Sequence, residues 1–242
     1  IADTAGPADG GLREVHRVMR IVRLGLGVYA TGEFAADALL RTQIALADYA
    51  ELMRRHGVEA VRMVATSAAR NVANRDAFFA MTGEVLDSVV SGAEAEVITG
   101  AQEDELSFRG AVGELDPAGA PFVVVDLGGG STEVVLGSED SGVAGTMTTL
   151  AALAMQLTTY DPNAIHLSRV GFDDLLAVCA DLLTMSHQQR AALGPMHEGR
   201  VDVIGGGAIV VQELAAALGQ RAGIGELVVS EHDILDGIAL SI

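Results

Sequence analysis

Residues 121–140, PFVVVDLGGGSTEVVLGSED, constrain the fold of this chain more than any other stretch. The run FVVVD reads as a continuous apolar strand that ends at Asp126, and after residues 128–133 a second β-branched run, VVLG, follows. A strand, a glycine loop and a returning strand predict a β-hairpin closed over a loop of backbone N–H groups. A dinucleotide-binding fold needs a helix after its glycines, so the pattern excludes that fold.

The rest of the chain alternates between strand-like and helix-like stretches. We expect a strand in 13–25, a helix that opens at Thr31 as N-cap and stops at Gly57, and a buried strand leading into a polar turn in 58–70. Next come a helix in 74–92, a strand in 93–100, helices in 101–115, 142–157 and 170–185, a strand, three glycines and a helix in 201–218, and a strand with a terminal helix in 226–242. This order predicts an α/β fold with some parallel pairing.

Composition excludes several classes of protein. With 15 basic and 33 acidic residues among 242, the net charge of −18 argues against nucleic acid or an anionic membrane as a partner. Every basic residue is arginine, so a P-loop, which needs lysine, is excluded. Cys179 is alone and is expected in the core. No metal-ligand spacing is visible for His56, His166, His187, His197 and His232, for which surface or capping roles are expected. Neither a membrane span nor a secretory signal is visible, so the expected location is the cytoplasm. Four arginines in 13–23 form either an exposed or an anion-facing cluster.

The glycine loop has the chemistry of an anion site. Glycines let backbone N–H groups approach a phosphate, and the Ser131 and Thr132 hydroxyls add donors. Asp126 ends a buried strand where a Mg²⁺ ligand would stand, and Glu133 on the returning strand could face the same pocket. Similar turns recur at Gly145-Thr146 and at 205–207, although a glycine triplet alone is as often an ordinary tight turn.

DLGGGSTE, preceded by ATSAARNVANRDAFF and ITGAQEDELSFRGAV, resembles the exopolyphosphatase/guanosine-pentaphosphate phosphatase (Ppx/GppA) family, in its short two-domain, actinobacterial type. The resemblance runs from about Arg20 to SEHDILDGIAL and implies two actin-like, ribonuclease-H-like domains of the sugar-kinase and Hsp70 ATPase class, flanking a cleft. We expect the first domain in 1–99 together with 231–242, and the second in 100–230.

The resemblance also implies roles for individual residues. Glu103 is the expected catalytic base that activates water, and Asp126 and Glu133 are the expected ligands of a divalent cation. The expected phosphate-binding residues are Ser67, Arg70, Gly128, Gly129, Gly130, Ser131 and Thr132, with Gly145, Thr146 and Gly206 lining the substrate channel more loosely. The implied cofactor is Mg²⁺ or Mn²⁺, with K⁺ as an additional monovalent cation, and the implied setting is the stringent response.

Two departures from the family pattern stand out. The strand and phosphate loop with which family members begin have no counterpart before Ile1. A segment that members usually carry is missing near residues 141–143. Glu105 also stands where members often have arginine.

The implied activity is release of terminal phosphate from inorganic polyphosphate. The alternatives are hydrolysis of guanosine pentaphosphate, a non-catalytic polyphosphate or alarmone sensor, and an actin-fold kinase or ATPase in which Glu103 has no role. A helix face such as ALADYAELM could serve a homodimer.

Overall fold

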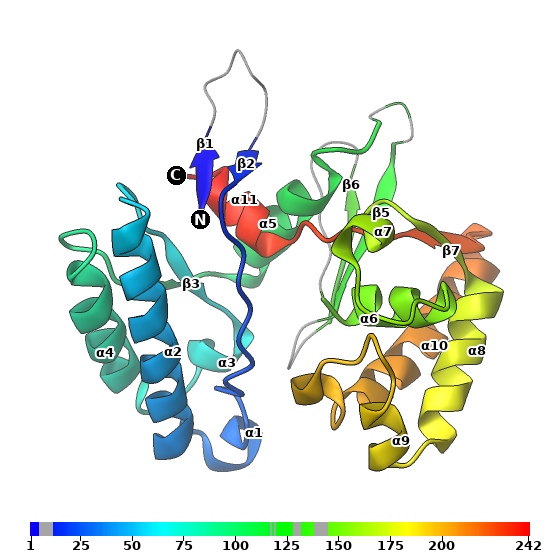
Figure 1. The fold of residues 1–242 in the computed structure, drawn as a ribbon, viewed down its shortest axis with the longest axis horizontal. Helices are drawn as coiled ribbons and strands as arrows, with labels where there is room; N and C mark the ends of the chain where they lie inside the picture. The colour runs from blue at the N-terminus through cyan, green and yellow to red at the C-terminus, as the bar shows by residue number, and fades with distance from the viewer. Residues whose placement is uncertain (5–11, 117, 119, 128–131, 138–144) are drawn as a thin grey trace. The chain divides into compact units, whose positions relative to one another are not determined.

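A computed structural model describes residues 1–4, 12–116, 118, 120–127, 132–137 and 145–242 (Figure 1). The chain forms two compact units, one holding the described residues of 1–106 and 235–242, the other those of 107–127 and 132–234. Helix α5 (Gly100–Val112) begins in the first unit and ends in the second. The domain boundaries expected from the sequence stay a prediction.

The first unit is built around a parallel pair of short strands. β3 (Met63–Ala65) pairs in parallel with β4 (Ala95–Val97), and α3 (Ser67–Arg70) and α4 (Arg75–Asp87) connect them. Figure 1 shows α2 (Ala36–Arg55) beside α4, against which it packs. This βαβ unit confirms the predicted parallel pairing, because parallel strands need a helical crossover. The unit also contains the antiparallel pair β1 (Ala2–Thr4) and β2 (Leu12–Glu14), and the short α1 (Val28–Thr31).

Two expectations for the start of the chain are wrong. Of the strand expected in 13–25, only Arg13 and Glu14 belong to a strand, as part of β2. Val18 and Met19 are exposed, because the rest of that segment has no partner strand among the described residues. The long helix begins at Ala36, not at Thr31. The Thr31 hydroxyl accepts the N–H of Glu33 at 3.2 Å, so it closes a local turn instead of capping the helix.

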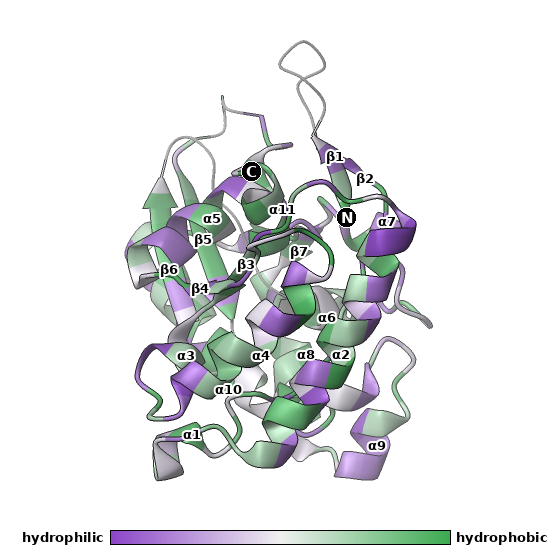
Figure 2. Cartoon of the chain, turned by 90° about the vertical axis from the view of Figure 1, so that its left-hand side faces the viewer, coloured by the Kyte–Doolittle hydropathy of each residue, from purple (hydrophilic) through white to green (hydrophobic). Residues whose placement is uncertain are grey.

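The second unit combines two antiparallel strand pairs with a helical core. The hairpin of β5 (Phe122–Leu127) and β6 (Thr132–Gly137) forms as predicted. Figure 2 shows β5 as largely hydrophobic and α9 as hydrophilic. The remaining elements are α6 (Gly145–Ala154), α7 (Pro162–Ile165), β7 (Arg169–Gly171), α8 (Phe172–Thr184), α9 (His187–Ala191), a 3₁₀ turn (Glu198–Arg200), α10 (Ile204–Ala222), β8 (Glu226–Val228), which pairs with β7, and α11 (Ile234–Ala239), which returns to the first unit.

The core of the second unit lies among α6, α8 and α10. Leu150, Leu175 and Val211 are buried there, and Cys179 is fully buried, which confirms its predicted core position. Burial of these side chains is the main stabilising contribution of the unit, at about 1.5–3 kcal/mol for each large one. In the part of the chain that the structure describes, no helix unites the length and the apolar character that a bilayer crossing demands.

The glycines at 205–207 do not follow a strand. Residues 201–203 form a turn, and α10 begins at Ile204, so the three glycines belong to its first turn. The expected strand and loop are therefore wrong here. A short apolar run fits a buried strand and a buried helix equally well, and the helical spacing of Ala208, Val211 and Ala215 decides in favour of the helix.

Candidate active site

The predicted catalytic base and the predicted phosphate-binding arginine touch each other in the first unit. Glu103 lies in the first turn of α5 and is 7% exposed. Arg70 ends α3, and its Nη2 donates to the Glu103 carboxylate while its Nε donates to the carbonyl oxygen of Ile98 at 3.0 Å. Ser67 opens the same four-residue helix. The parallel β3–β4 pair thus brings together two residues that are 33 positions apart.

The contact leaves Arg70 able to bind a second anion. A guanidinium has five N–H donors, and the carbonyl and Glu103 take two of them. The remaining donors can hold a phosphate oxygen beside the Glu103 carboxylate. A buried carboxylate held in place by an arginine is a fixed proton acceptor, which is what a general base must be.

The two predicted metal ligands share one face of the hairpin in the second unit. Asp126 on β5 lies directly opposite Glu133 on β6, so both side chains project to the same side. Phe108 and Val112 of α5 pack over this face against Val124. Asp126 is buried and accepts a hydrogen bond from the hydroxyl of Ser107, also on α5, at 2.9 Å.

This arrangement fits a divalent cation. Two like charges directly opposite each other weaken an antiparallel pair unless a counter-charge lies between them. Carboxylate oxygens are the ligands that Mg²⁺ takes in proteins. Asp126 and Glu133 therefore have the charge, the register and the ligand type to hold such an ion together.

The other predicted residues occupy separate places. Thr132 is exposed and opens β6, and Gly145 and Thr146 open α6. Gly206 is exposed in the first turn of α10, so it belongs to a helix and not to a loop. Gly128, Gly129, Gly130 and Ser131 lie outside the described residues, as does the junction near 141–143.

A partly buried polar network next to α6 was not predicted from the sequence. Thr148 donates to the Tyr160 oxygen at 2.7 Å, and the Tyr160 hydroxyl donates to Glu231 at 2.6 Å. Arg200 donates to the hydroxyl of Thr149 at 2.7 Å. Burial raises the pKa of Tyr160 well above its usual range, and the bond to Glu231 adds to the rise. Burial lowers the pKa of the Arg200 guanidinium. The hint in the sequence is the adjacent Thr148 and Thr149, two of the three threonines in an otherwise apolar helix.

Three further side chains meet although no spacing in the sequence announces them. Glu114, His166 and His232 each place one metal-ligating atom within 4.8 Å of the others, so together they could hold a metal ion. The hydrogen bond from His166 is the main cause that lowers the pKa of Glu114. The sequence shows no metal-ligand spacing for His166 and His232, because the group is assembled from distant segments.

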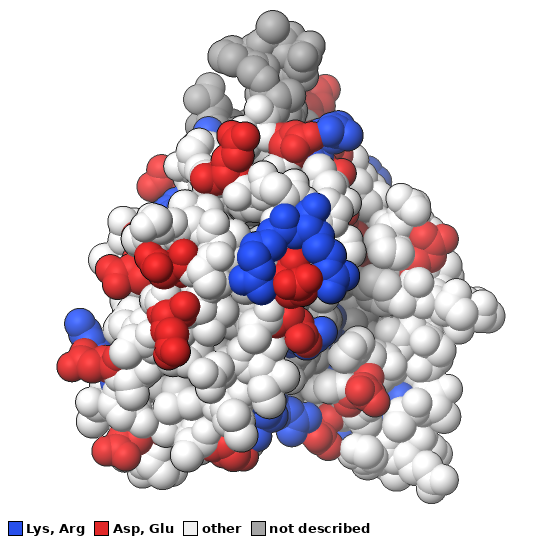
Figure 3. Space-filling view, turned by 60° about the vertical axis from the view of Figure 1, so that its left-hand side comes forward, with Lys and Arg blue, Asp and Glu red and all other residues white. Residues whose placement is uncertain are grey.

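The arginine cluster of residues 13–23 is not an open anion site. Arg13 pairs with Asp3, Arg17 with Glu14 and Asp236, and Arg20 with Asp48. Figure 3 shows basic side chains directly beside acidic ones on the face that it presents. These ion pairs support the first interpretation of the cluster, an exposed face whose charges are already balanced.

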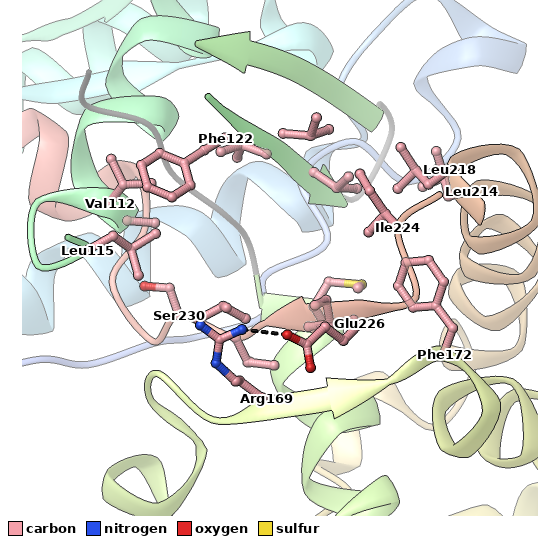
Figure 4. A pocket seen from close by; sticks show the side chains of 18 of the residues that line it. Val112, Leu115, Phe122, Arg169, Phe172, Leu214, Leu218, Ile224, Glu226 and Ser230 are labelled. Atoms are coloured by element: carbon pink, nitrogen blue, oxygen red, sulfur yellow. Dashed lines mark hydrogen bonds and ion pairs between the residues drawn. The ribbon is translucent and has the colours of Figure 1, made fainter. Parts of the chain in front are cut away.

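An apolar cavity of the second unit is also unsuited to a polyanion. It measures about 440 Å³ and is lined mostly by apolar side chains such as Phe122, Leu214 and Ile224 (Figure 4). Arg169, at its lower side in the figure, is already paired with Glu226. Neither Asp126 nor Glu133 lines it.

Comparison with known proteins identifies the family of this chain. The chain belongs to the Ppx/GppA phosphatase family, whose sequence profile matches residues 4–144 and 139–242. The protein is therefore an enzyme of the phosphatase class, and its fold is the predicted two-part, actin-like α/β arrangement.

Individual relatives make the resemblance more specific. Exopolyphosphatase 2 of Mycobacterium tuberculosis is 56% identical over 298 aligned positions, which cover all of this chain and 93% of that protein. A crystal structure of an exopolyphosphatase-like protein matches with a TM-score of 0.83 and 31% identity, over 95% of this chain and 92% of the other. A guanosine-5′-triphosphate,3′-diphosphate pyrophosphatase of Photobacterium profundum is 30% identical over 53% of this chain and 24% of its own length.

The alignment with Exopolyphosphatase 2 is longer than the chain itself. That relative therefore carries residues without a counterpart here. The position of such a gap near 141–143 stays a prediction.

Proposed function

We propose that this protein is a metal-dependent exopolyphosphatase that releases orthophosphate from the end of inorganic polyphosphate. The observation that best supports hydrolysis by an activated water molecule is the direct contact between Arg70 and the buried Glu103. The substrate is inferred from Exopolyphosphatase 2, which is similar over the whole chain, whereas the guanosine-nucleotide enzyme is similar over about half of it. The guanosine pentaphosphate alternative is therefore not favoured.

In the proposed reaction, Arg70 binds oxygens of the terminal phosphate and Glu103 orients a water molecule. The water oxygen attacks the terminal phosphorus, Glu103 accepts its proton, and the bond from phosphorus to the bridging oxygen breaks. The products are orthophosphate and a chain shorter by one phosphate. Arg70 stabilises charge on the transferring group throughout, since a guanidinium stays protonated at any physiological pH.

Asp126 and Glu133 would hold the divalent cation, with Ser107 orienting Asp126. When bound, this cation neutralises charge on the phosphate oxygens. We propose Mg²⁺ because the ligands are carboxylates, with Mn²⁺ as a substitute and K⁺ as an additional counter-ion. Backbone N–H groups of residues 128–132, and those of the first turns of α6 and α10, would bind further phosphates. We also place the reaction in the cytoplasm, while the homodimer stays a prediction.

The test is phosphate release from long-chain polyphosphate, with and without Mg²⁺, by the wild type and by Glu103→Gln. We expect metal-dependent release that the substitution reduces by about 10²-fold or more, as is typical for loss of a general base. The matched control is Glu105→Gln, which alters an exposed carboxylate on the same helix and should retain activity. An equal loss in both variants would contradict the role of Glu103.

The same assay with guanosine pentaphosphate decides the substrate. Faster release from the nucleotide than from polyphosphate would overturn the proposed specificity. Binding of polyphosphate without release, even with Mg²⁺, would overturn the enzyme proposal in favour of a sensor.

A further inference from the structure

A second group of metal-ligating side chains lies in the second unit, apart from the two carboxylates of the hairpin. Glu114 follows the end of α5, His166 follows α7, and His232 lies between β8 and α11. One ligand atom from each residue lies within 4.8 Å of the other two. Three separate segments of the chain therefore converge on one point.

The distances suit a small ion. Glu114 Oε2 lies 2.9 Å from His166 Nε2, and Glu114 Oε1 lies 4.0 Å from His232 Nδ1. Two ligands of a tetrahedral zinc ion are about 3.3 Å apart, as its bond lengths require. The imidazole rings have centroids 4.5 Å apart and are tilted by 37°, and one nitrogen of each lies within 4.8 Å of the other and of a Glu114 carboxylate oxygen. Small side-chain rotations would complete the coordination.

The ligand types select a different metal from that of the proposed reaction. Two imidazole nitrogens and one carboxylate suit Zn²⁺, Co²⁺ or Ni²⁺, whereas Mg²⁺ takes oxygen ligands. Glu114 is exposed and both histidines are half-buried, so an ion can enter from solvent and keep a water ligand. We propose that Glu114, His166 and His232 form a second metal site, selective for a transition ion such as zinc.

The hydrogen bonds of His166 predict what metal binding changes. His166 Nδ1 accepts the backbone N–H of Glu231 at 3.2 Å, so in the metal-free protein the ring proton resides on Nε2 and points at Glu114. A metal ion needs the lone pair of Nε2, and the proton then moves through solvent to Nδ1. Nδ1–H and the Glu231 N–H are both donors, so their hydrogen bond is lost. Metal binding therefore releases the Glu231 amide while it links three segments.

The first experiment is a calorimetric titration of the full chain with Zn²⁺ in excess Mg²⁺, which saturates sites made of oxygen ligands. We expect one zinc per chain, with affinity reduced at least about tenfold in His232→Ala and in Glu114→Gln. The control is His187→Ala, since His187 pairs with a single carboxylate, Asp202, at 3.0 Å and should bind zinc no differently. Co²⁺ should give a visible absorption band that His232→Ala abolishes.

The second readout is amide hydrogen exchange, which separates coordination from general stabilisation. We expect the Glu231 amide to exchange faster with zinc bound, while the amides of the surrounding core exchange more slowly. Glu114→Gln retains a hydrogen-bond acceptor for His166, so it tests the site even if His232→Ala unfolds. Zinc affinity that is unchanged in both His232→Ala and Glu114→Gln, or no zinc binding at all, would overturn the proposal and leave a purely hydrogen-bonded group.

Discussion

Asp126 and Glu133 face each other across the β5–β6 hairpin, and both project to the side that α5 covers. The Ser107 hydroxyl binds only one of them, Asp126, among the contacts described. The pair therefore combines an oriented carboxylate with one that can adjust to an incoming ion. The two facing charges destabilise the metal-free protein and favour the binding of a cation.

Glu133→Gln should have opposite effects without and with metal. Without metal it removes like-charge repulsion, so the free energy of unfolding should rise by about 0.2–1 kcal/mol. With Mg²⁺ it removes a ligand, so the stabilisation that Mg²⁺ confers should shrink. Urea unfolding in EDTA and in Mg²⁺ measures both effects, with Glu105→Gln as the control. Destabilisation in EDTA would show that the two carboxylates do not repel each other.

Arg70→Lys should raise KM for polyphosphate more than it lowers kcat. Lysine keeps the positive charge but loses the planar group that reaches Ile98 and Glu103 at the same time. Loss of a charged hydrogen bond costs about 1.5–3 kcal/mol, which corresponds to a roughly 10- to 100-fold rise in KM. Initial rates over a range of polyphosphate concentrations measure the split. Arg109→Lys, at an exposed position on α5, is the control and should leave both constants unchanged.

Tyr160→Phe should destabilise the second unit by about 1–3 kcal/mol, because it removes a hydrogen-bond partner from buried Thr148 and from Glu231. Chemical denaturation at neutral pH measures this cost. Tyr29→Phe is the matched control, since that ring is 84% exposed and its change should stay within about 0.5 kcal/mol. Equal effects at the two positions would mean that the network contributes no stability.

Cys179 should resist thiol reagents until the protein unfolds. Burial raises the pKa of its thiol to about 11 from an ordinary 9.0, so the folded state holds the thiol proton more tightly than the unfolded state does. The resulting stability is present below pH 9.0 and is lost as pH rises toward 11. Alkylation by iodoacetamide at pH 9.0, with and without urea, measures the difference. Rapid labelling of the folded protein would contradict the buried position.

Local patterns explain the features that sequence analysis predicted correctly. The β5–β6 hairpin follows from two β-branched runs around a glycine loop, and the register then places Asp126 beside Glu133. Gly57 ends the long helix as expected, with a left-handed φ of 63° that glycine adopts without strain. The contact of Arg70 with Glu103 joins two residues that the family resemblance had marked separately.

Contacts between distant segments of the chain could not be predicted from the sequence. Arg17 and Asp236 are 219 positions apart, and only the return of α11 to the first unit brings them together. The same holds for His166 and His232, whose neighbourhood depends on where β8 ends. The strand and loop predicted for residues 201–207 were wrong for another reason, since a short apolar run with glycines fits both a strand and a helix.

Helix α5 carries Glu103 in one unit and Ser107 in the other, four residues apart. Four residues are about one turn and advance about 6 Å along the axis, so both side chains lie on the same side of the helix. A glycine or proline introduced into this turn would therefore disturb two functions at once, the proposed base and the hydroxyl that orients Asp126.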